Sequence, residues 1–338
     1  MSGILDALTD FFANPWALLA LKVLIVATVV PVVGLVLGFA ELKLSAKMQS
    51  RVGPYFAGGR WGWAQLIADA VKGFQKEDLI PDEADHPVFK LAPYLVLVGT
   101  FALLVVVPWG PGLVFWDLPV GVFYALAISS LSTIGVLMAG WSSANKYSLM
   151  GGLRAAGQLI AYELPLVLAV IGSVIMAETM SLSGIVEAQI EAGFPYVLVQ
   201  FLGFGIFMIA ALAELTRIPF DMPIAESELV MGYLTEYSGF RFLFFFIGEY
   251  ANMFTMSAIA ATLFLGGYWL PGIPESMLTF LGPVILLAKV FLLAFAMIWF
   301  RWTFPRFRED QLQTLAWKWL IPLALLNIVL TAAFKVVF

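Results

Sequence analysis

Long apolar runs separated by short polar segments dominate the chain. Eight of these runs have about the 20 residues that an α-helix needs to cross a bilayer. They cover residues 16–40, 89–107, 120–140, 155–177, 196–215, 242–266, 278–300 and 315–336. None shows the strict alternation over about ten residues that marks a transmembrane β-strand. The pattern predicts an all-α polytopic membrane protein with about eight transmembrane helices, in a single membrane domain over residues 1–338.

The basic residues predict how these helices are oriented. Of the 18 Lys and Arg residues, 15 fall in, or within four residues of, the four loops that follow the first, third, fifth and seventh runs. Lys22 and Lys289 lie inside runs, which leaves only Lys335 for the other side. Because Lys and Arg accumulate in cytoplasmic loops, these four loops are predicted to be cytoplasmic and both termini outside. They include residues 41–88 and 214–241.

The first of these loops, residues 41–88, contains an amphipathic pattern. Apolar side chains recur at helical spacing, and polar side chains occupy the opposite face. The apolar set is Trp63, Leu66, Ile67, Ala70 and Phe74, and the polar set is Gln65, Asp69, Lys72 and Lys76. We expect this helix to lie in the headgroup plane of the membrane. The alternative is an ordinary loop helix that keeps two spans apart.

Two apolar motifs predict packing contacts and not ligand sites. Gly34 and Gly38 form a GxxxG pattern in the first run, which favours close helix packing. Four aromatic residues begin the sixth run and are predicted to face lipid or the core: Phe242, Phe244, Phe245 and Phe246.

The composition limits the chemistry that this chain can carry by itself. It has no Cys and one His, His86, so it lacks ligands for a thiolate-bound iron–sulfur cluster, a haem or a His-based metal site. It shows no Gly-rich nucleotide loop and no nucleophile constellation, so NAD binding, ATP binding and covalent catalysis are not expected. Any redox cofactor is therefore expected in another polypeptide, or as an organic molecule that passes through.

Residues 214–228 concentrate charge in a protein that is only 12% charged. This segment carries Glu214, Arg217, Asp221, Glu226 and Glu228 between two apolar runs. A simple turn between membrane helices does not need four carboxylates and an arginine. The excess predicts a functional loop.

Two further carboxylates, Glu163 and Glu249, are expected inside apolar runs, on the order of 10 Å below the cytoplasmic surface. Carboxylates held close together out of water share protons, and a chain of them can relay protons near neutral pH. The alternative is that each glutamate pairs with an arginine or a hydroxyl and joins helices. Lys289 is a candidate partner for one of them.

Four cytoplasmic segments carry a resemblance to a known family. They are residues 49–54 with 68–72 and 76–78, residues 140–148 with 162–163, residues 217–221 with 226–230 and 236–237, and residues 305–308 with 310–312. In this order they resemble the membrane subunit called H in bacteria and subunit one in mitochondria, from the proton-pumping NADH:quinone oxidoreductase, respiratory complex I. Eight spans with both ends outside agree with that family.

The resemblance implies a subunit that joins a peripheral electron-transfer arm to a membrane arm in the plasma membrane of a bacterium. Quinone would be a substrate that reaches the last iron–sulfur cluster through a tunnel lined by this chain. The implied partners are peripheral-arm iron–sulfur and quinone-site subunits, small and antiporter-like membrane-arm subunits, and the lipid bilayer, with no nucleic acid. Iron–sulfur clusters and flavin are then expected only in partner subunits.

Two sets of residues carry over from the family by position. The quinone tunnel corresponds to Arg51, Gly53, Pro54, Asp69, Lys72, Arg217, Pro219, Phe220 and Asp221. The acidic proton path corresponds to Glu163, Glu214, Glu226, Glu228 and Glu249.

The chain departs from the family pattern at a few positions. Ile224 stands where a glutamate is common, and Tyr55 where an asparagine usually follows Gly-Pro. Residues that are usual in the family are also replaced at Leu42 and Lys43, after Glu41, and at Leu215 and Thr216, before Arg217. The open alternatives are the membrane anchor of a related hydrogenase or other dehydrogenase complex, a stand-alone proton-coupled carrier, and a purely structural anchor.

Overall fold

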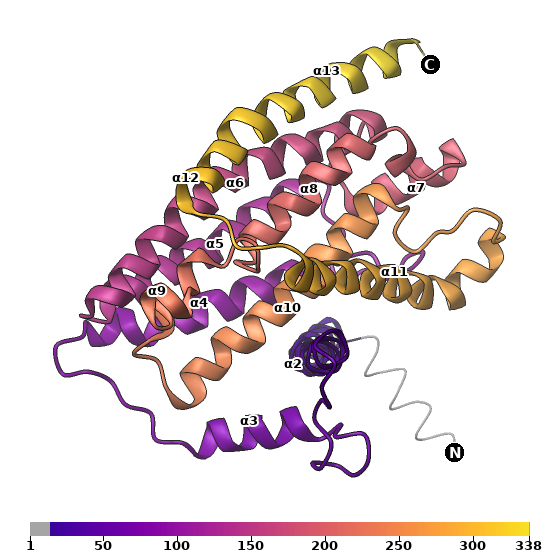
Figure 1. Ribbon diagram of the computed structural model, residues 1–338. Helices are drawn as coiled ribbons and strands as arrows, with labels where there is room; N and C mark the ends of the chain where they lie inside the picture. Colours follow the sequence, from indigo (N-terminus) through magenta and orange to yellow (C-terminus); the bar gives the residue numbers. More distant parts are fainter. Residues whose placement is uncertain (1–13, 338) are drawn as a thin grey trace, which may run out of the picture.

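The computed structural model describes residues 14–337, and these contain helices, one isolated β-bridge and no strand (Figure 1). The α-helices are α2 (Pro15–Met48), α3 (Gln65–Gln75), α4 (His86–Leu104), α5 (Gly121–Ser142), α6 (Lys146–Ala177), α7 (Leu182–Ala192), α8 (Phe201–Glu214), α9 (Glu226–Leu229), α10 (Gly239–Phe264), α11 (Glu275–Thr303), α12 (Glu309–Thr314) and α13 (Ile321–Val337). Short helical turns are η1 (Tyr196–Leu198), η2 (Met222–Ile224), η3 (Gly232–Leu234) and η4 (Leu315–Leu320).

The all-α polytopic prediction is confirmed. Among the described residues, 7 helical segments are long and apolar enough to cross a membrane, the last being the continuous stretch Glu309–Val337. The fifth predicted run forms a shorter helix, α8, of 14 residues. Both termini were predicted to lie outside, and residues 1–13 and 338 fall beyond the described residues, so that orientation stays a prediction.

Helix α2 is longer than its apolar run. It continues to Met48, past the predicted end at residue 40, because residues 41–48 contain neither Gly nor Pro and consist largely of good helix formers. The first loop therefore begins later than predicted. As a consequence Glu41 lies on the helix and is buried in the bundle.

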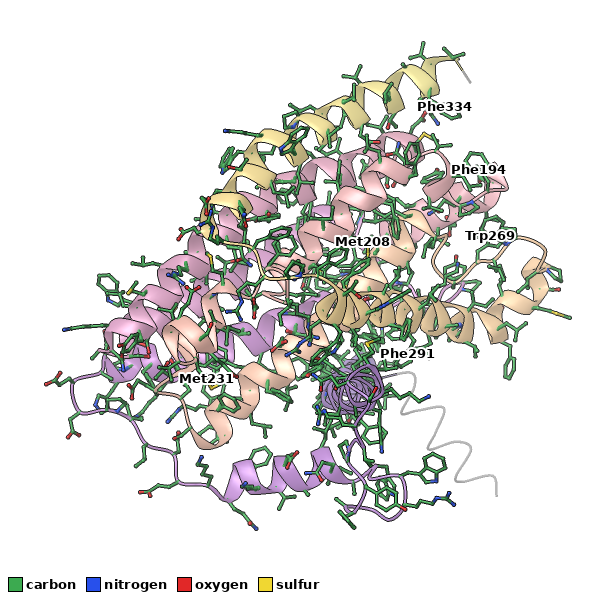
Figure 2. The ribbon with its side chains drawn as sticks, viewed as in Figure 1. Phe194, Met208, Met231, Trp269, Phe291 and Phe334 are labelled. Atoms are coloured by element: carbon green, nitrogen blue, oxygen red, sulfur yellow. The ribbon has the colours of Figure 1, made fainter. Side chains whose placement is uncertain are left out.

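Helix α10 is central to the bundle. It packs against α2, α4 and α11, while α6 packs against α5, α8 and α13. Apolar residues from these helices form the main core, and Met208 on α8 lies near its middle (Figure 2). Gly34 on α2 approaches the backbone of Ile247 on α10, and Gly38 approaches Leu66 and Tyr250. The predicted packing role of the GxxxG pattern is thus confirmed.

Helix α3 forms where the amphipathic pattern predicted a helix. It lies beside the bundle, next to α2 and α10 (Figure 1). Leu66 is buried against α2, whereas Ile67 and Phe74 are exposed. Its position in the headgroup plane of a membrane stays a prediction.

Close backbone contacts join the C-terminal end of α5 to the N-terminal part of α6. Gly140 and Gly152 face each other, and a Cβ on Gly151 would come within 2.6 Å of the Gly232 Cα in η3. Backbone atoms cannot move aside cheaply, so only glycine fits at Gly151.

We expect Gly151→Ala to lower the stability of the protein by about 1–3 kcal/mol, because the added methyl group overpacks a rigid contact. Thermal melting of the purified protein measures this change. Gly157→Ala on the same helix is the matched control, since the nearest atom to its Cβ would be Gln313 Nε2 at 3.9 Å. An equal loss in both variants would contradict the packing argument.

Candidate functional site

A buried ion-pair cluster joins α2, α10, α11 and the loop after α8. Arg217 Nη1 donates to Glu41 Oε2 at 2.5 Å, and Arg217 Nη2 lies 3.0 Å from Glu249 Oε1. Arg301 on α11 forms an ion pair with the other oxygen of Glu41. The Arg217 guanidinium also lies over the ring of Tyr250, 4.7 Å from its centre. We call Glu41, Arg217, Glu249 and Arg301 the Glu41 cluster.

The end of α8 directs Arg217 into this cluster. Thr216 has a positive φ of 50°, and the Arg217 N–H donates to the carbonyl of Leu212 at 3.2 Å. This left-handed turn with a hydrogen bond back to the last helical turn is a common way to end a helix. It folds the chain back against the bundle at Arg217.

The Glu41 cluster balances two positive groups with two negative groups. The Arg217 side chain is 1% exposed and the Glu41 side chain 5%, so their charges lie largely out of water. Burial alone would lower the pKa of Arg217, but the carboxylates of Glu41 and Glu249 more than offset it and hold that pKa above its ordinary value. Arg217 therefore stays charged, and a change in either carboxylate changes the balance of the whole cluster.

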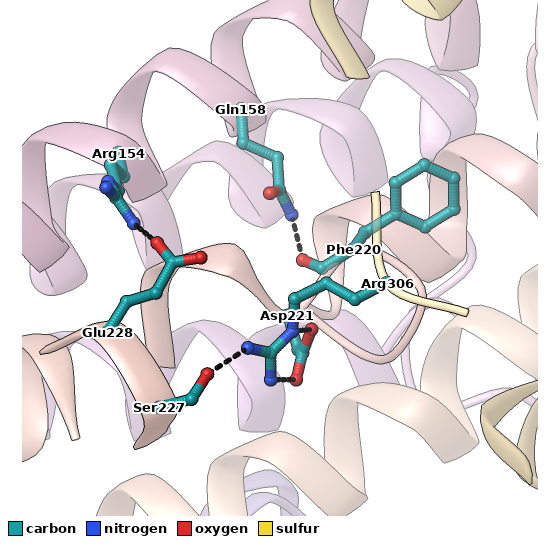
Figure 3. A network of polar contacts seen from close by, with 7 residues as sticks. All are labelled: Arg154, Gln158, Phe220, Asp221, Ser227, Glu228 and Arg306. Carbon is teal, nitrogen blue, oxygen red and sulfur yellow. Dashed lines mark hydrogen bonds and ion pairs between the residues drawn. The ribbon is translucent and has the colours of Figure 1, made fainter. Parts of the chain in front are cut away.

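Gln158 on α6 fixes the loop that follows Arg217. Its Nε2 donates to the carbonyl of Ala213 at 2.8 Å and to the carbonyl of Phe220 at 2.7 Å (Figure 3). Phe220 is buried between the rings of Tyr162 and Phe307. One fully buried amide thus holds the end of α8 and the loop in a fixed relation.

Two ion pairs connect the loop after α8, and the short helix α9 that follows it, to neighbouring segments of the chain. Arg306 donates to both oxygens of Asp221, at 2.7 and 2.6 Å, and to the hydroxyl of Ser227 at 3.2 Å (Figure 3). The hydrogen bonds to Asp221 hold the pKa of Arg306 above its ordinary value. Arg154 on α6 pairs with Glu228 at 2.6 Å. The segment between α11 and α12 and the loop after α8 are therefore joined by charge.

Of the predicted acidic path, three members lie in the bundle and two do not. Glu249 belongs to the Glu41 cluster, while Glu163 and Glu214 lie on α6 and α8, close enough to act on each other electrostatically. Glu226 and Glu228 are exposed in this chain, and their place on the proton path stays a prediction. Their short helix, α9, follows the loop at the surface, where water stabilises both charges.

The suggestion that Lys289 pairs with a carboxylate is wrong for the described residues. Its Nζ donates to the backbone carbonyls of Leu265 and Gly267, at 2.5 and 2.9 Å, and to that of Trp269. These carbonyls lie at and beyond the end of α10, where helical carbonyls lack partners and attract a positive charge. Lys289 therefore acts as a cap for α10.

The predicted tunnel residues fall in three places. Arg51, Gly53 and Pro54 line an open cavity of about 440 Å³ beside α2, and Asp69 lines a second, apolar one beside α3. Lys72 is exposed and lines neither. The set from Arg217 to Asp221 lies in the loop held by Gln158 and Arg306, away from the linings of both cavities.

The apolar cavity has a volume of about 570 Å³ and lies between α2, α3, α4 and α10. Phe242, Phe244 and Phe246 line it, while Phe245 is buried in the core as predicted. Gly34 and Leu35 of α2 line it as well. Gly34 and Glu41 are seven residues apart and hence on one face of α2. The cavity therefore lies two helical turns from the Glu41 cluster.

Sequence reasoning missed several residues of the site. Glu41 was assigned to a loop because its run was predicted to end at residue 40. Gln158 and Arg306 gave no sequence signal of their contacts, since their partners are distant in the chain. The position of Glu41 directly after an apolar run is the signal that could have indicated its burial.

Ionised groups buried among membrane-length helices define this chain as a polytopic membrane protein with a polar interior. A model of the NADH dehydrogenase family matches residues 21–332. The H subunit of the NADH-quinone oxidoreductase of Bacillus mycoides (strain KBAB4) is 49% identical over 310 residues, which are 90% of this chain and 91% of that protein. The protein of the same name from Anoxybacillus flavithermus (strain DSM 21510 / WK1) is 48% identical over the same share of both chains. The chain thus belongs to the NADH dehydrogenase family, and the resemblance carried by the four segments described above is confirmed.

We expect Arg217→Met to destabilise the protein by about 3–5 kcal/mol, because it removes an ion-pair partner from the buried Glu41 carboxylate and from the half-buried Glu249 carboxylate. The drop in the thermal melting midpoint measures it. Arg154→Met is the matched control: its partner Glu228 is 50% exposed, and a surface pair is worth less than about 1 kcal/mol. Equal shifts in the two variants would contradict the central role of the Glu41 cluster.

Proposed function

We propose that this chain is the membrane subunit of a complex I type NADH:quinone oxidoreductase that gives quinone access to the reaction site and couples its reduction to proton movement. The observation that carries the proposal is the position of the Glu41 cluster two helical turns from a large apolar cavity on the same helices, α2 and α10. Family membership and the names of its relatives support the same function.

The apolar cavity suits the isoprenoid tail of a quinone. Its lining is almost entirely aliphatic and aromatic, with Asp69 the single ionisable side chain. It is open beside the amphipathic helix α3, which fits entry from the membrane interface. Quinone reduction takes up electrons from a partner subunit and protons from the surroundings. This chain supplies the path of access and no redox cofactor.

The Glu41 cluster suits the coupling step. A quinone that gains electrons nearby draws protons and changes the local charge, and a balanced group of two cations and two anions responds to such a change. Glu163 and Glu214 continue the series of carboxylates through α6 and α8. We therefore place the proton path along Glu249, Glu214 and Glu163, with Glu226 and Glu228 at its surface end.

The remaining parts of the proposal concern the assembly. Peripheral iron–sulfur subunits would dock on the four basic loops at the cytoplasmic face of a bacterial plasma membrane, and antiporter-like subunits would continue the membrane arm. Copurification of the tagged chain distinguishes this assembly from a stand-alone carrier. Recovery of the chain without iron–sulfur partners would favour the carrier.

We expect Ala70→Trp to raise the KM for quinone by about tenfold with little change in kcat, because the indole fills part of the cavity through which the tail passes. Steady-state quinone reductase assays on the assembled complex in membranes give both constants. Ala68→Trp is the matched control, since Ala68 is exposed on the same helix and does not line the cavity. Unchanged kinetics in Ala70→Trp would remove this cavity from quinone access.

We expect Glu163→Gln to lower quinone-coupled proton translocation by at least about tenfold, because the amide cannot take up a proton in place of the carboxylate. A pH-sensitive dye in sealed vesicles measures the rate. Glu187→Gln is the control, because Glu187 is exposed on α7. Full translocation in Glu163→Gln, with normal quinone reduction, would exclude Glu163 from the path.

A further inference from the structure

A small polar cavity lies inside the bundle beside Glu214. It has a volume of about 10 Å³ and is lined from four helices, by Gly99, Leu103, Ile128, Ser129, Ser132, Glu214, Leu215, Asn252 and Met256. This volume is at the lower limit for one water molecule, which also needs two to four polar partners. Polar atoms from α5, α8 and α10 meet that condition.

One carboxyl oxygen of Glu214 lacks a hydrogen-bond donor among the described residues. Its Oε2 is buried and accepts no hydrogen bond from any residue in the described part of the chain. Leaving a buried acceptor of this kind without a donor costs about 1–3 kcal/mol, and more when it is charged. A donor small enough for a 10 Å³ cavity is therefore expected beside it.

The surrounding side chains already use part of their hydrogen-bonding capacity. The hydroxyls of Ser129 and Ser132 donate to helix carbonyls at 2.9 and 2.7 Å, and the Ser129 hydroxyl also lies within reach of the Glu214 carboxyl, which leaves the Ser132 oxygen as an acceptor. The Asn252 Oδ1 accepts from Thr100 at 2.9 Å, which leaves the Asn252 Nδ2 as a donor. A water molecule accepts from that amide and donates to Glu214 and to a serine oxygen. Each group then has the partner that its chemistry requires.

We propose that this cavity is a binding site for one water molecule, held by Asn252, that hydrogen-bonds to the Glu214 carboxylate and lets Glu214 ionise inside the bundle. The inference rests on the proposed proton path. It adds the water molecule that allows Glu214, one member of that path, to lose its proton. Hydrogen bonds to the charged form of a carboxyl favour that form. Asn252 is a positioning residue here, because it acts through the water.

Among the ionisable groups, Glu163 on α6 acts electrostatically on Glu214, and the Ser129 hydroxyl on α5 also interacts with its carboxyl group. Arg217 follows on the turn after α8, and Glu249 and Tyr250 lie on α10. At this level α4 and α5 contribute hydroxyl groups, and Lys335 of α13 lies at the other end of the bundle, bonded to the carbonyl of Met176. These groups are unchanged by a substitution at Asn252, so the substitution isolates the water.

A map of the assembled complex at about 2 Å resolution tests the site directly. We expect density for one water within hydrogen-bond distance of Glu214 Oε2 and Asn252 Nδ2. A side chain filling the cavity, or direct contact between Glu214 and Asn252, would overturn the proposal.

The pH profile of quinone-coupled proton translocation tests the role of the water. With Asn252→Leu we expect the acidic limb to move to higher pH by about one unit, because the ionised carboxylate loses a hydrogen bond worth at least about 1.4 kcal/mol. Asn252→Gln retains an amide and is expected to restore most of the shift. Met253→Leu, an apolar change on the same helix at a residue that does not line the cavity, is the matched control and leaves the profile unchanged.

The outcomes separate this inference from the proposed function. An unshifted profile in Asn252→Leu together with a strong loss in Glu214→Gln would overturn the water site and leave the proton path standing. Full translocation in Glu214→Gln would overturn the proton path itself. If Asn252→Leu does not assemble, Thr100→Val removes the hydroxyl that orients the amide, and we expect a shift in the same direction. A profile unchanged by Thr100→Val would then count against the site.

Discussion

The buried contact between Arg217 and Glu41 is the interaction on which the interior of this protein depends. Two charges that lie almost entirely out of water stabilise each other only when both are present and well placed. Their placement needs α2 to continue past its apolar run, α8 to end in a left-handed turn, and Arg301 to reach Glu41 from α11. The fold around the cluster is thus set by electrostatics as much as by apolar packing.

The loop after α8 follows from the same constraint. A segment at this depth cannot leave its backbone groups without partners, and it contains Pro219 and Pro223, which offer no N–H. Gln158 supplies a buried amide, Arg306 binds Asp221, and Phe220 fills the space between two aromatic rings. The loop is therefore shaped by α6 and by the segment between α11 and α12, and a charge change in the loop affects both.

Much of the architecture could be predicted from the sequence, because apolar runs of membrane length leave a helix few alternatives. The membership of the site was harder to predict. Glu226 and Glu228 share a motif with Arg217 but lie at the surface, since motif spacing does not report depth. The roles of Glu41 and Lys289 depend on tertiary contacts. Glu41 pairs with two arginines from distant segments, and Lys289 donates to three carbonyls at the end of a helix. Local pattern carries no information about such partners.

The shortness of α8 has a consequence for the electric field. Its 14 residues rise about 21 Å, whereas the apolar core of a bilayer is about 30 Å thick. A crossing at α8 therefore needs η1 before the helix, or the loop with Arg217 after it, to complete that thickness. Such non-helical backbone has to be enclosed by protein at that depth. The membrane voltage, worth about 2.3 kcal/mol per charge per 100 mV across the full thickness, would then fall over fewer apolar residues at α8 than at the longer helices.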